Sequence, residues 1–204
     1  MNVLFINGWG ISQSAARNIL DTIDQFDSIA IVQPVRQWVE LAASLAGQAD
    51  MVIGYSTGAF LLMGEPELAA SFRRRVLLAS FLDFKAESGL GGKTRVAQLK
   101  FLLRWLKSDP VAALEDFYER AGLDFEIPNE LPVSPIDLSW GIERLLKDSH
   151  GPDALHGFES YIGSNDSLME AHRLIELAPD LEVLDGVGHD LRGLVTATFG
   201  KGIV

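Results

Sequence analysis

A serine that stands between two glycines has the clearest capacity for chemistry in this 204-residue sequence. Gly54, Ser56 and Gly58 fit the pattern G-x-S-x-G, in which a sharp turn from a strand into a helix presents a serine hydroxyl above a sheet. The flanking segments suit this turn, because the apolar run 51–53 predicts a strand and 59–63 predicts a helix. The pattern favours Ser56 as a nucleophile, with a helix-capping serine in an ordinary glycine-rich turn as the alternative.

A serine nucleophile needs a base to remove its proton, and the chain has four histidines. His189 follows the last apolar strand in a loop that contains Gly186 and Gly188, so its side chain can reach over the carboxyl edge of a sheet. Surface or hinge positions suit the others, which are His150, His156 and His172. We expect His189 to be the base, with a solvated loop histidine as the alternative.

The imidazole of such a base is usually oriented by a carboxylate near its other ring nitrogen. Asp166 follows a predicted strand over 157–162, at the carboxyl end where sheets of this kind place their functional loops. We expect Asp166 to orient His189. The alternative is that Asp166 only caps a helix that begins near Ser167.

Acyl transfer also needs hydrogen-bond donors for the oxyanion of the tetrahedral intermediate. The amide of Thr57 lies at the start of the predicted helix, and the loop after the first strand can add the amide of Trp9. We expect these two amides to form the oxyanion hole, with a plain turn as the alternative for the loop.

Two nucleotide-binding patterns are incomplete in this sequence. Glu87 stands where a P-loop needs glycine, and Gln13 stands where a dinucleotide-binding fingerprint needs glycine.

Composition limits the remaining chemistry. The chain has no cysteine, which excludes thiolate nucleophiles and cysteine-based metal sites, and we expect no metal and no cofactor. A net charge of −11 argues against a nucleic-acid partner and against binding to anionic membranes. Because there is no signal peptide and no apolar run of about 18 residues, we expect a soluble cytoplasmic protein.

The elements that must position these residues alternate between strand and helix. Strands are predicted at 3–6, 28–33, 51–55 and 75–79, and helices at 14–25, at 59–63 and on the face formed by Trp38, Leu41, Ala42 and Leu45. Helices alone are predicted at 96–106, 110–121 and 142–146. Alternation then resumes, with strands at 157–162 and 181–184 and helices at 167–177 and after His189.

This order of elements predicts an α/β fold with a mostly parallel sheet and helices on both faces. We expect a single domain whose core consists of residues 1–81 and 151–204. Residues 82–150 are expected to form a helical lid inserted into that core.

These features together resemble the α/β-hydrolase superfamily and, within it, the pimeloyl-acyl-carrier-protein methyl ester carboxylesterases of biotin synthesis. The order Ser56, Asp166, His189 is the superfamily's order of nucleophile, acid and base. Most relatives have a histidine where this chain has Asn7. The resemblance implies a serine esterase that cleaves the methyl ester of a pimeloyl chain on acyl-carrier protein. It extends over the loops 8–10 and 188–189, the turns 54–58 and 166–168, and the lid segments 99–106 and 141–146.

A cluster of cations supports a protein-borne substrate separately from the resemblance. Residues 85–107 contain six basic side chains and the single acid Glu87 within an otherwise strongly acidic chain. We expect four of them to share a helix face that binds an acidic acyl-carrier protein: Lys93, Lys100, Arg104 and Lys107. The alternative is the solvated face of a lid helix whose other side covers the pocket with Phe101, Leu102, Trp105 and Leu106.

The sequence thus predicts a serine carboxylesterase in which Ser56 attacks the ester and His189 transfers its proton. Tyr55 and Phe81 are expected to line the acyl pocket. Two alternatives stay open: a thioesterase or general short-chain esterase, and a catalytically silent module that binds a carrier protein.

Overall fold

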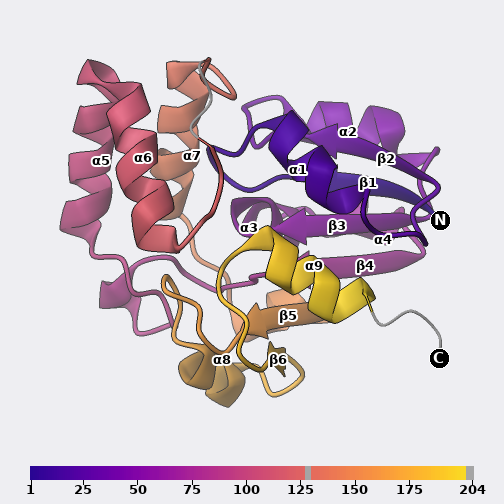
Figure 1. Cartoon of the computed structure of the whole chain (residues 1–204). Coiled ribbons are helices and arrows are strands. Elements are labelled where there is room, and N and C mark those ends of the chain that lie inside the picture. Colours follow the sequence, from indigo (N-terminus) through magenta and orange to yellow (C-terminus); the bar gives the residue numbers. More distant parts are fainter. Residues whose placement is uncertain (127–129, 201–204) are drawn as a thin grey trace.

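Parallel strands form one sheet at the centre of the protein, as the computed structural model of residues 1–126 and 130–200 shows (Figure 1). The described residues contain six strands in the order β2-β1-β3-β4-β5-β6, and every neighbouring pair runs parallel. The predicted parallel sheet is therefore confirmed. The strands are β1 (Asn2–Ile6), β2 (Ser28–Val32), β3 (Met51–Tyr55), β4 (Arg74–Leu78), β5 (Glu159–Gly163) and β6 (Glu182–Leu184).

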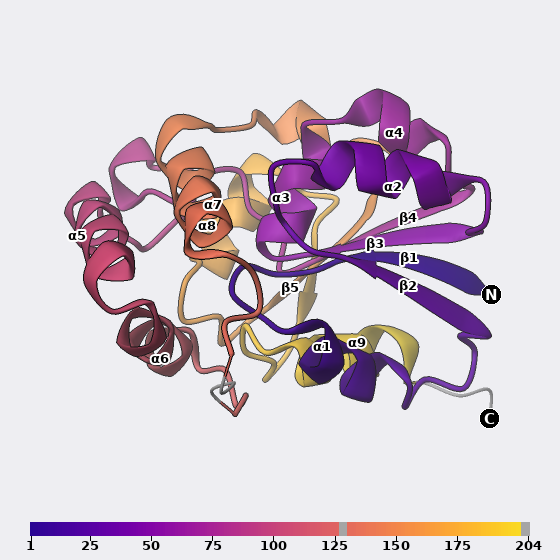
Figure 2. The ribbon, with the colours of Figure 1, turned by 90° about the horizontal axis from the view of Figure 1, so that it is seen from above.

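Helices cover both faces of the sheet, as predicted. Helices α1 and α9 lie on one face, and α2, α3 and α4 lie on the other (Figure 2). Every residue of β3 is buried between these layers, which explains its continuous apolar sequence. No helix among the described residues is both long and apolar enough to cross a membrane. The bounds are α1 (Gln13–Leu20), α2 (Trp38–Ala46), α3 (Thr57–Met63), α4 (Pro66–Ala70), α8 (Ala171–Leu177) and α9 (Leu191–Phe199).

The helices on either side of β2 differ from the sequence prediction. The helix predicted over 14–25 ends at Leu20, because the chain turns at Thr22, whose amide and hydroxyl both bond to the carbonyl of Ile19. The buried face of α2 is narrower than predicted, since Leu41 is 47% exposed. Both differences arise from local hydrogen bonding and packing that apolar spacing does not record.

The helix predicted over 167–177 begins only at Ala171. The preceding residues 168–170 pair instead with the segment 91–93: the amide of Lys93 donates to the carbonyl of Leu168, 2.9 Å away, and residues 92 and 169 form an antiparallel bridge. This pairing uses backbone groups that a longer helix would need.

Three further helices lie together beyond the carboxyl ends of the strands (Figure 1). We call them the helical insert: α5 (Val96–Ser108), α6 (Pro110–Ala121) and α7 (Pro135–Lys147). Helix α5 packs on α6 and α7. Of the side chains that the alternative interpretation placed over a pocket, Leu102 and Leu106 are buried, whereas Phe101 is 54% exposed. Residues 127–129 of the predicted lid and 201–204 of the predicted core lie outside the described residues.

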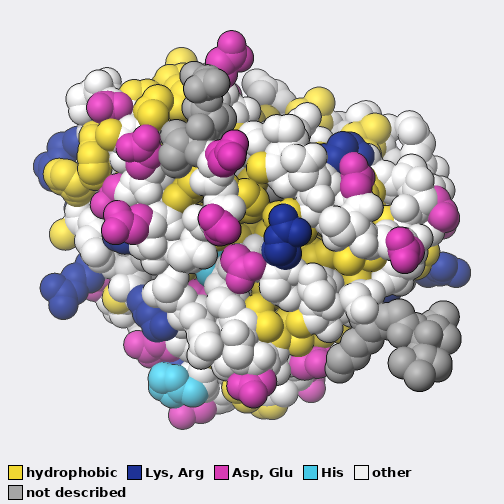
Figure 3. All heavy atoms as spheres, viewed as in Figure 1, with side chains coloured by type: hydrophobic (Ala, Val, Ile, Leu, Met, Phe, Trp, Pro, Cys, Tyr) yellow, Lys and Arg dark blue, Asp and Glu magenta, His cyan; other side chains and the backbone are white. Residues whose placement is uncertain are grey.

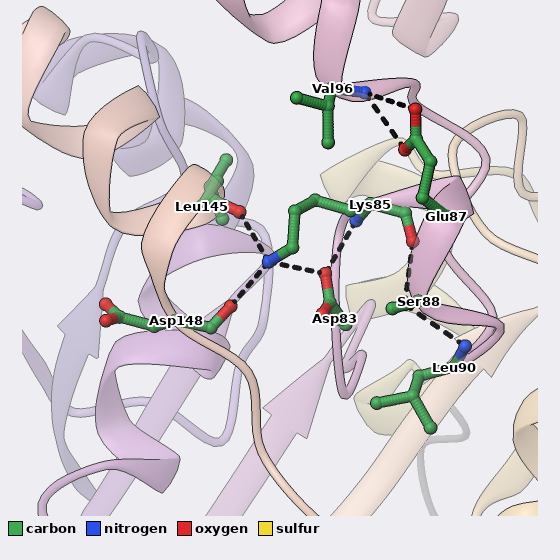
Figure 4. A network of polar contacts seen from close by, with 8 residues as sticks. All are labelled: Asp83, Lys85, Glu87, Ser88, Leu90, Val96, Leu145 and Asp148. Carbon is green, nitrogen blue, oxygen red and sulfur yellow. Dashed lines mark hydrogen bonds and ion pairs between the residues drawn. The ribbon is translucent and has the colours of Figure 1, made fainter.

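A lysine that follows β4 holds the end of the helical insert (Figure 4). The Lys85 ammonium lies 3.0 Å from Oδ1 of Asp83, and the two side chains are 16% and 3% exposed. The same ammonium donates to the carbonyls of Leu145 and Asp148, at 3.3 and 2.9 Å, where α7 ends. A cation at this end of a helix is electrostatically favourable.

A carboxylate from the same segment holds the start of the helical insert. Both oxygens of Glu87 accept 3.0 Å hydrogen bonds from the amide of Val96, the first residue of α5. An anion is favourable at this end of a helix. The segment after β4 therefore ties both ends of the insert to the sheet (Figure 4).

We predict that Lys85→Met lowers the free energy of unfolding by on the order of 3 kcal/mol, because it leaves the Asp83 carboxylate buried without its cation. Urea unfolding followed by circular dichroism measures this change. Lys147→Met is the control, since Lys147 is 70% exposed and its nitrogen lies 3.8 Å from Glu143. Equal stability of the two variants would contradict the conclusion that Lys85 stabilises the buried Asp83 and the end of the helical insert.

Candidate active site

Ser56 occupies a strained turn between β3 and α3. Its φ of 52° and ψ of −116° form a conformation that an L-residue adopts only when its surroundings impose it. The amide of Ser56 donates to the carbonyl of Leu78 at 2.8 Å, and its carbonyl accepts from Phe60 at 3.0 Å. The hydroxyl does not cap α3, so the capping alternative is wrong. The turn holds this side chain at the carboxyl edge of the sheet.

The turn brings other atoms so close to positions 54 and 58 that only glycine fits there. A Cβ on Gly58 would lie 2.2 Å from the carbonyl oxygen of Ile6, and one on Gly54 would lie 2.7 Å from Cα of Ala59. The start of α3 therefore packs directly on the end of β1. This contact brings Thr57 to the loop that follows β1.

Three side chains from separate loops meet at this turn. Ser56 Oγ lies 2.9 Å from Nε2 of His189, and Nδ1 of His189 lies 2.7 Å from Oδ2 of Asp166. When Nδ1 carries the ring proton and donates it to Asp166, Nε2 is left to accept the hydroxyl proton of Ser56. All three residues are buried. The structure thus brings together the serine, histidine and aspartate that the sequence singled out.

The Asp166 carboxyl is buried yet favours its charged form. Burial raises its pKa, but the charge and hydrogen bond of His189 and the amides of Leu168 and Met169 together hold the pKa below its usual value. The two amides donate to Oδ1 at 2.8 and 3.0 Å. Asp166 therefore fixes the turn 167–169, and it does not cap a helix that begins near Ser167. Its charge can stabilise an imidazolium at His189.

Two contacts hold the His189 loop against the sheet. A Cβ on Gly163 would lie 2.2 Å from the carbonyl oxygen of Val187, so the end of β5 touches this loop. The hydroxyl of Tyr55 donates to the carbonyl of His189 at 2.8 Å. Burial, with the charge of Asp166, raises the pKa of Tyr55 well above its usual value, so this hydroxyl stays a donor. Sequence reasoning missed both supports, although Gly163 directly follows a predicted strand.

The loop after β1, residues 7–10, is fixed by buried amide side chains. Asn7 accepts from the amide of Gly8 at 2.9 Å and donates to the carbonyl of Ile11 at 2.8 Å. Gln33 donates to the same carbonyl at 3.0 Å. Within the described residues, the amides of Trp9 and Thr57 donate to no other group of the protein. The two donors expected for an oxyanion are therefore available to a ligand.

The two residues predicted to line an acyl pocket are fully buried in the protein core. Tyr55 and Phe81 are both 0% exposed, and Phe81 stacks on Phe60 with ring centroids 5.0 Å apart. Their place in an acyl pocket stays a prediction. A cavity of about 500 Å³ lies between α1, the segment after α6 and the start of α9. Asp190, the residue after His189, lines this cavity, but Ser56 does not.

The other three histidines form no hydrogen bond with Ser56, His189 or Asp166 among the described residues. His150 is half-buried and bonds to the carbonyl of Phe60 at 2.9 Å, and burial lowers its pKa. His156 and His172 are exposed. In the described part of the chain, no three His, Cys, Asp or Glu residues gather to hold a metal ion.

The cations predicted to bind a carrier protein fall into two groups. Lys100, Arg104 and Lys107 are exposed on α5, and Figure 3 shows Lys and Arg beside hydrophobic side chains at the edge of the molecule over this helix. Lys93 precedes α5, and its ammonium donates to the carbonyl of Asp166 at 2.6 Å. The prediction that Lys93 shares their helix face is wrong, because α5 begins at Val96.

Comparison with known proteins identifies the fold. No family model and no curated protein sequence matches the chain. The hydrolase olei00960 from Oleispira antarctica matches with a TM-score of 0.65 and 13% identity over 98% of this chain and 86% of its own. The esterase EaEST from Exiguobacterium antarcticum matches with a TM-score of 0.65 and 13% identity over 93% and 85%. BioG from Haemophilus influenzae matches with a TM-score of 0.58 and 14% identity over 92% and 87%. These similarities establish the α/β-hydrolase fold.

We predict that Gly58→Ala destabilises the protein by roughly 1–3 kcal/mol, because the added Cβ meets two backbone carbonyls that cannot rotate away. Gly47→Ala is the matched control, since a Cβ there has no neighbour within 4 Å and the φ of Gly47 is −67°. That change should leave stability within about 1 kcal/mol of wild type. Chemical denaturation of both variants measures the difference, and equal midpoints would rule out the close contact of α3 with β1.

Proposed function

We propose that this protein, which has the α/β-hydrolase fold, is a serine hydrolase that cleaves carboxylic esters through an acyl-enzyme intermediate. The observation that carries the proposal is the buried chain of contacts from Ser56 to His189 to Asp166, with the serine held at a strained turn. Non-glycine residues with a strained backbone cluster at active sites. A protein that only binds a partner does not need this arrangement.

In the first half of the reaction, Ser56 Oγ attacks the carbonyl carbon while its proton moves to Nε2 of His189. The carbonyl π electrons move to oxygen, and the amides of Trp9 and Thr57 bind the resulting oxyanion. The tetrahedral intermediate then re-forms its carbonyl and expels the alkoxide. His189 gives its proton to this leaving group, which departs as an alcohol.

In the second half, water replaces the alcohol. His189 takes a proton from the water as the oxygen attacks the acyl carbon, and the same amides bind the second oxyanion. Collapse breaks the bond to Ser56 Oγ and returns the proton to the serine. Asp166 keeps the imidazole oriented and stabilises its positive charge in both halves.

We further propose that the substrate is the methyl ester of a pimeloyl chain carried on acyl-carrier protein. The sequence resemblance and the structural likeness to BioG support this choice. So do the exposed cations Lys100, Arg104 and Lys107 around the exposed ring of Phe101, a surface that complements an acidic partner with an apolar side chain. A thioesterase or a general short-chain esterase would use the same three residues.

We predict that a fluorophosphonate probe modifies Ser56, as peptide mass mapping would detect. Labelling should be absent in Ser56→Ala and greatly slowed in His189→Ala, because the serine loses its base. Turnover of a p-nitrophenyl ester by Ser56→Ala should fall by ~10⁴-fold or more. His172→Ala is the control, since His172 is exposed on α8. An unlabelled Ser56 in folded wild-type protein would overturn the proposed function.

We predict that the double variant Lys100→Glu/Lys107→Glu raises KM for an ester carried on acyl-carrier protein by about 10-fold or more at low salt. The reason is that both substitutions reverse a positive charge on α5, the helix proposed to bind the acidic carrier protein. KM for a p-nitrophenyl ester should not change. Arg73→Glu/Lys147→Glu makes the same change in net charge with two exposed cations outside α5 and serves as the control. Equal effects of the two double variants would argue against docking on α5.

A further inference from the structure

Two side chains join the loop 7–10 to the helical insert. Tyr118 on α6 is buried, and its hydroxyl donates a 2.6 Å hydrogen bond to the carbonyl of Gly10. Trp9 is 2% exposed, and its indole Nε1 donates to the carbonyl of Leu138 on α7 at 2.8 Å. Both helices therefore bond to the loop that carries the Trp9 amide.

The indole of Trp9 is enclosed by these two helices. The ring of Phe117 on α6 meets it edge-on, with centroids 4.8 Å apart. A Cβ on Gly141 of α7 would lie 2.5 Å from Cδ1 of Trp9, so the indole lies against the helix backbone. Contacts this close leave the Trp9 side chain, and with it the Trp9 Cα, little freedom to move.

The bond from Tyr118 restrains the other side of the Trp9 amide. Burial raises the pKa of Tyr118 to about 12, so its hydroxyl remains a donor throughout the neutral range. Gly10 has a φ of 75°, and a Cβ there would lie 2.6 Å from Leu114 on α6. Asn7 already fixes Gly8, the residue before Trp9. The loop is therefore held on both sides of the Trp9 amide, which donates to no other group in the described residues.

We propose that Tyr118 is a positioning residue for the reaction: by holding the Gly10 carbonyl it aims the Trp9 amide at the oxyanion. The inference rests on the proposed function, because the direction of this amide matters only if an oxyanion forms. The helical insert then contributes to the chemical step through α6, which carries Tyr118. Its own ends are fixed to the sheet by Lys85 and Glu87, so it provides a stable reference for the loop.

Tyr118→Phe tests this role, because it removes one oxygen atom and keeps the ring. We expect kcat for p-nitrophenyl butyrate to fall about 10- to 100-fold with KM unchanged, as for a misaligned oxyanion donor. The rate of fluorophosphonate labelling at Ser56 should fall by a similar factor. Tyr161→Phe is the control, since Tyr161 lies on β5 and its hydroxyl forms no hydrogen bond with the loop 7–10 among the described residues.

The outcomes separate this inference from the proposed function. If wild-type Ser56 is not labelled, the proposed function fails. If wild type is labelled and Tyr118→Phe keeps its kcat, or only raises KM, the positioning role is overturned. If Tyr118→Phe does not fold, Tyr118→Met takes its place, because it also removes the hydroxyl that donates to Gly10 and keeps a long apolar side chain in the buried position. A loss confined to kcat supports the role, and an unchanged kcat overturns it.

Discussion

The site depends on keeping an ionised carboxylate inside the protein. Asp166 is 2% exposed, and a buried charge is costly unless hydrogen bonds and an opposite charge compensate for it. Two amides of the turn 167–169 supply the bonds, and His189, 23 residues along the chain, supplies the third. The same bond turns the imidazole toward Ser56. The stability of the buried charge and the readiness of the base therefore come from one arrangement, which the contact of Gly163 with the His189 loop makes possible.

The helical insert and the segments next to it are bonded to the turn after Asp166, to the loop 7–10 and to the segment after β4. The segment 91–93, which leads into α5, pairs with the turn after Asp166, and Lys93 also donates to the Asp166 carbonyl. Helices α6 and α7 hold the loop 7–10 through Tyr118 and Trp9. Lys85 and Glu87 hold the two ends of the insert. The acid and the oxyanion loop are thus both supported by residues that lie far from them in the chain.

Much of this could be predicted from the sequence, because short apolar strands, glycine spacing and the order of polar residues after strands are local signals. They located the sheet and the serine, aspartate and histidine. Contacts between distant segments leave no such signal. Lys93 lies seven positions before Lys100 and fits a helix face by spacing, yet the pairing of 91–93 with the Asp166 turn keeps it outside α5. The bond from Tyr118 to Gly10 spans 108 positions and depends on where the insert packs.

The most direct test of ester cleavage through Ser56 is a pre-steady-state measurement with p-nitrophenyl butyrate, combined with intact mass analysis. We predict a rapid release of up to one equivalent of p-nitrophenol, accompanied by a butyryl group that peptide mapping assigns to Ser56. Without a nucleophile, release would be slow and linear from the start. A linear time course in folded protein, with no acyl group on Ser56 at any quench time, would contradict the acyl-enzyme mechanism.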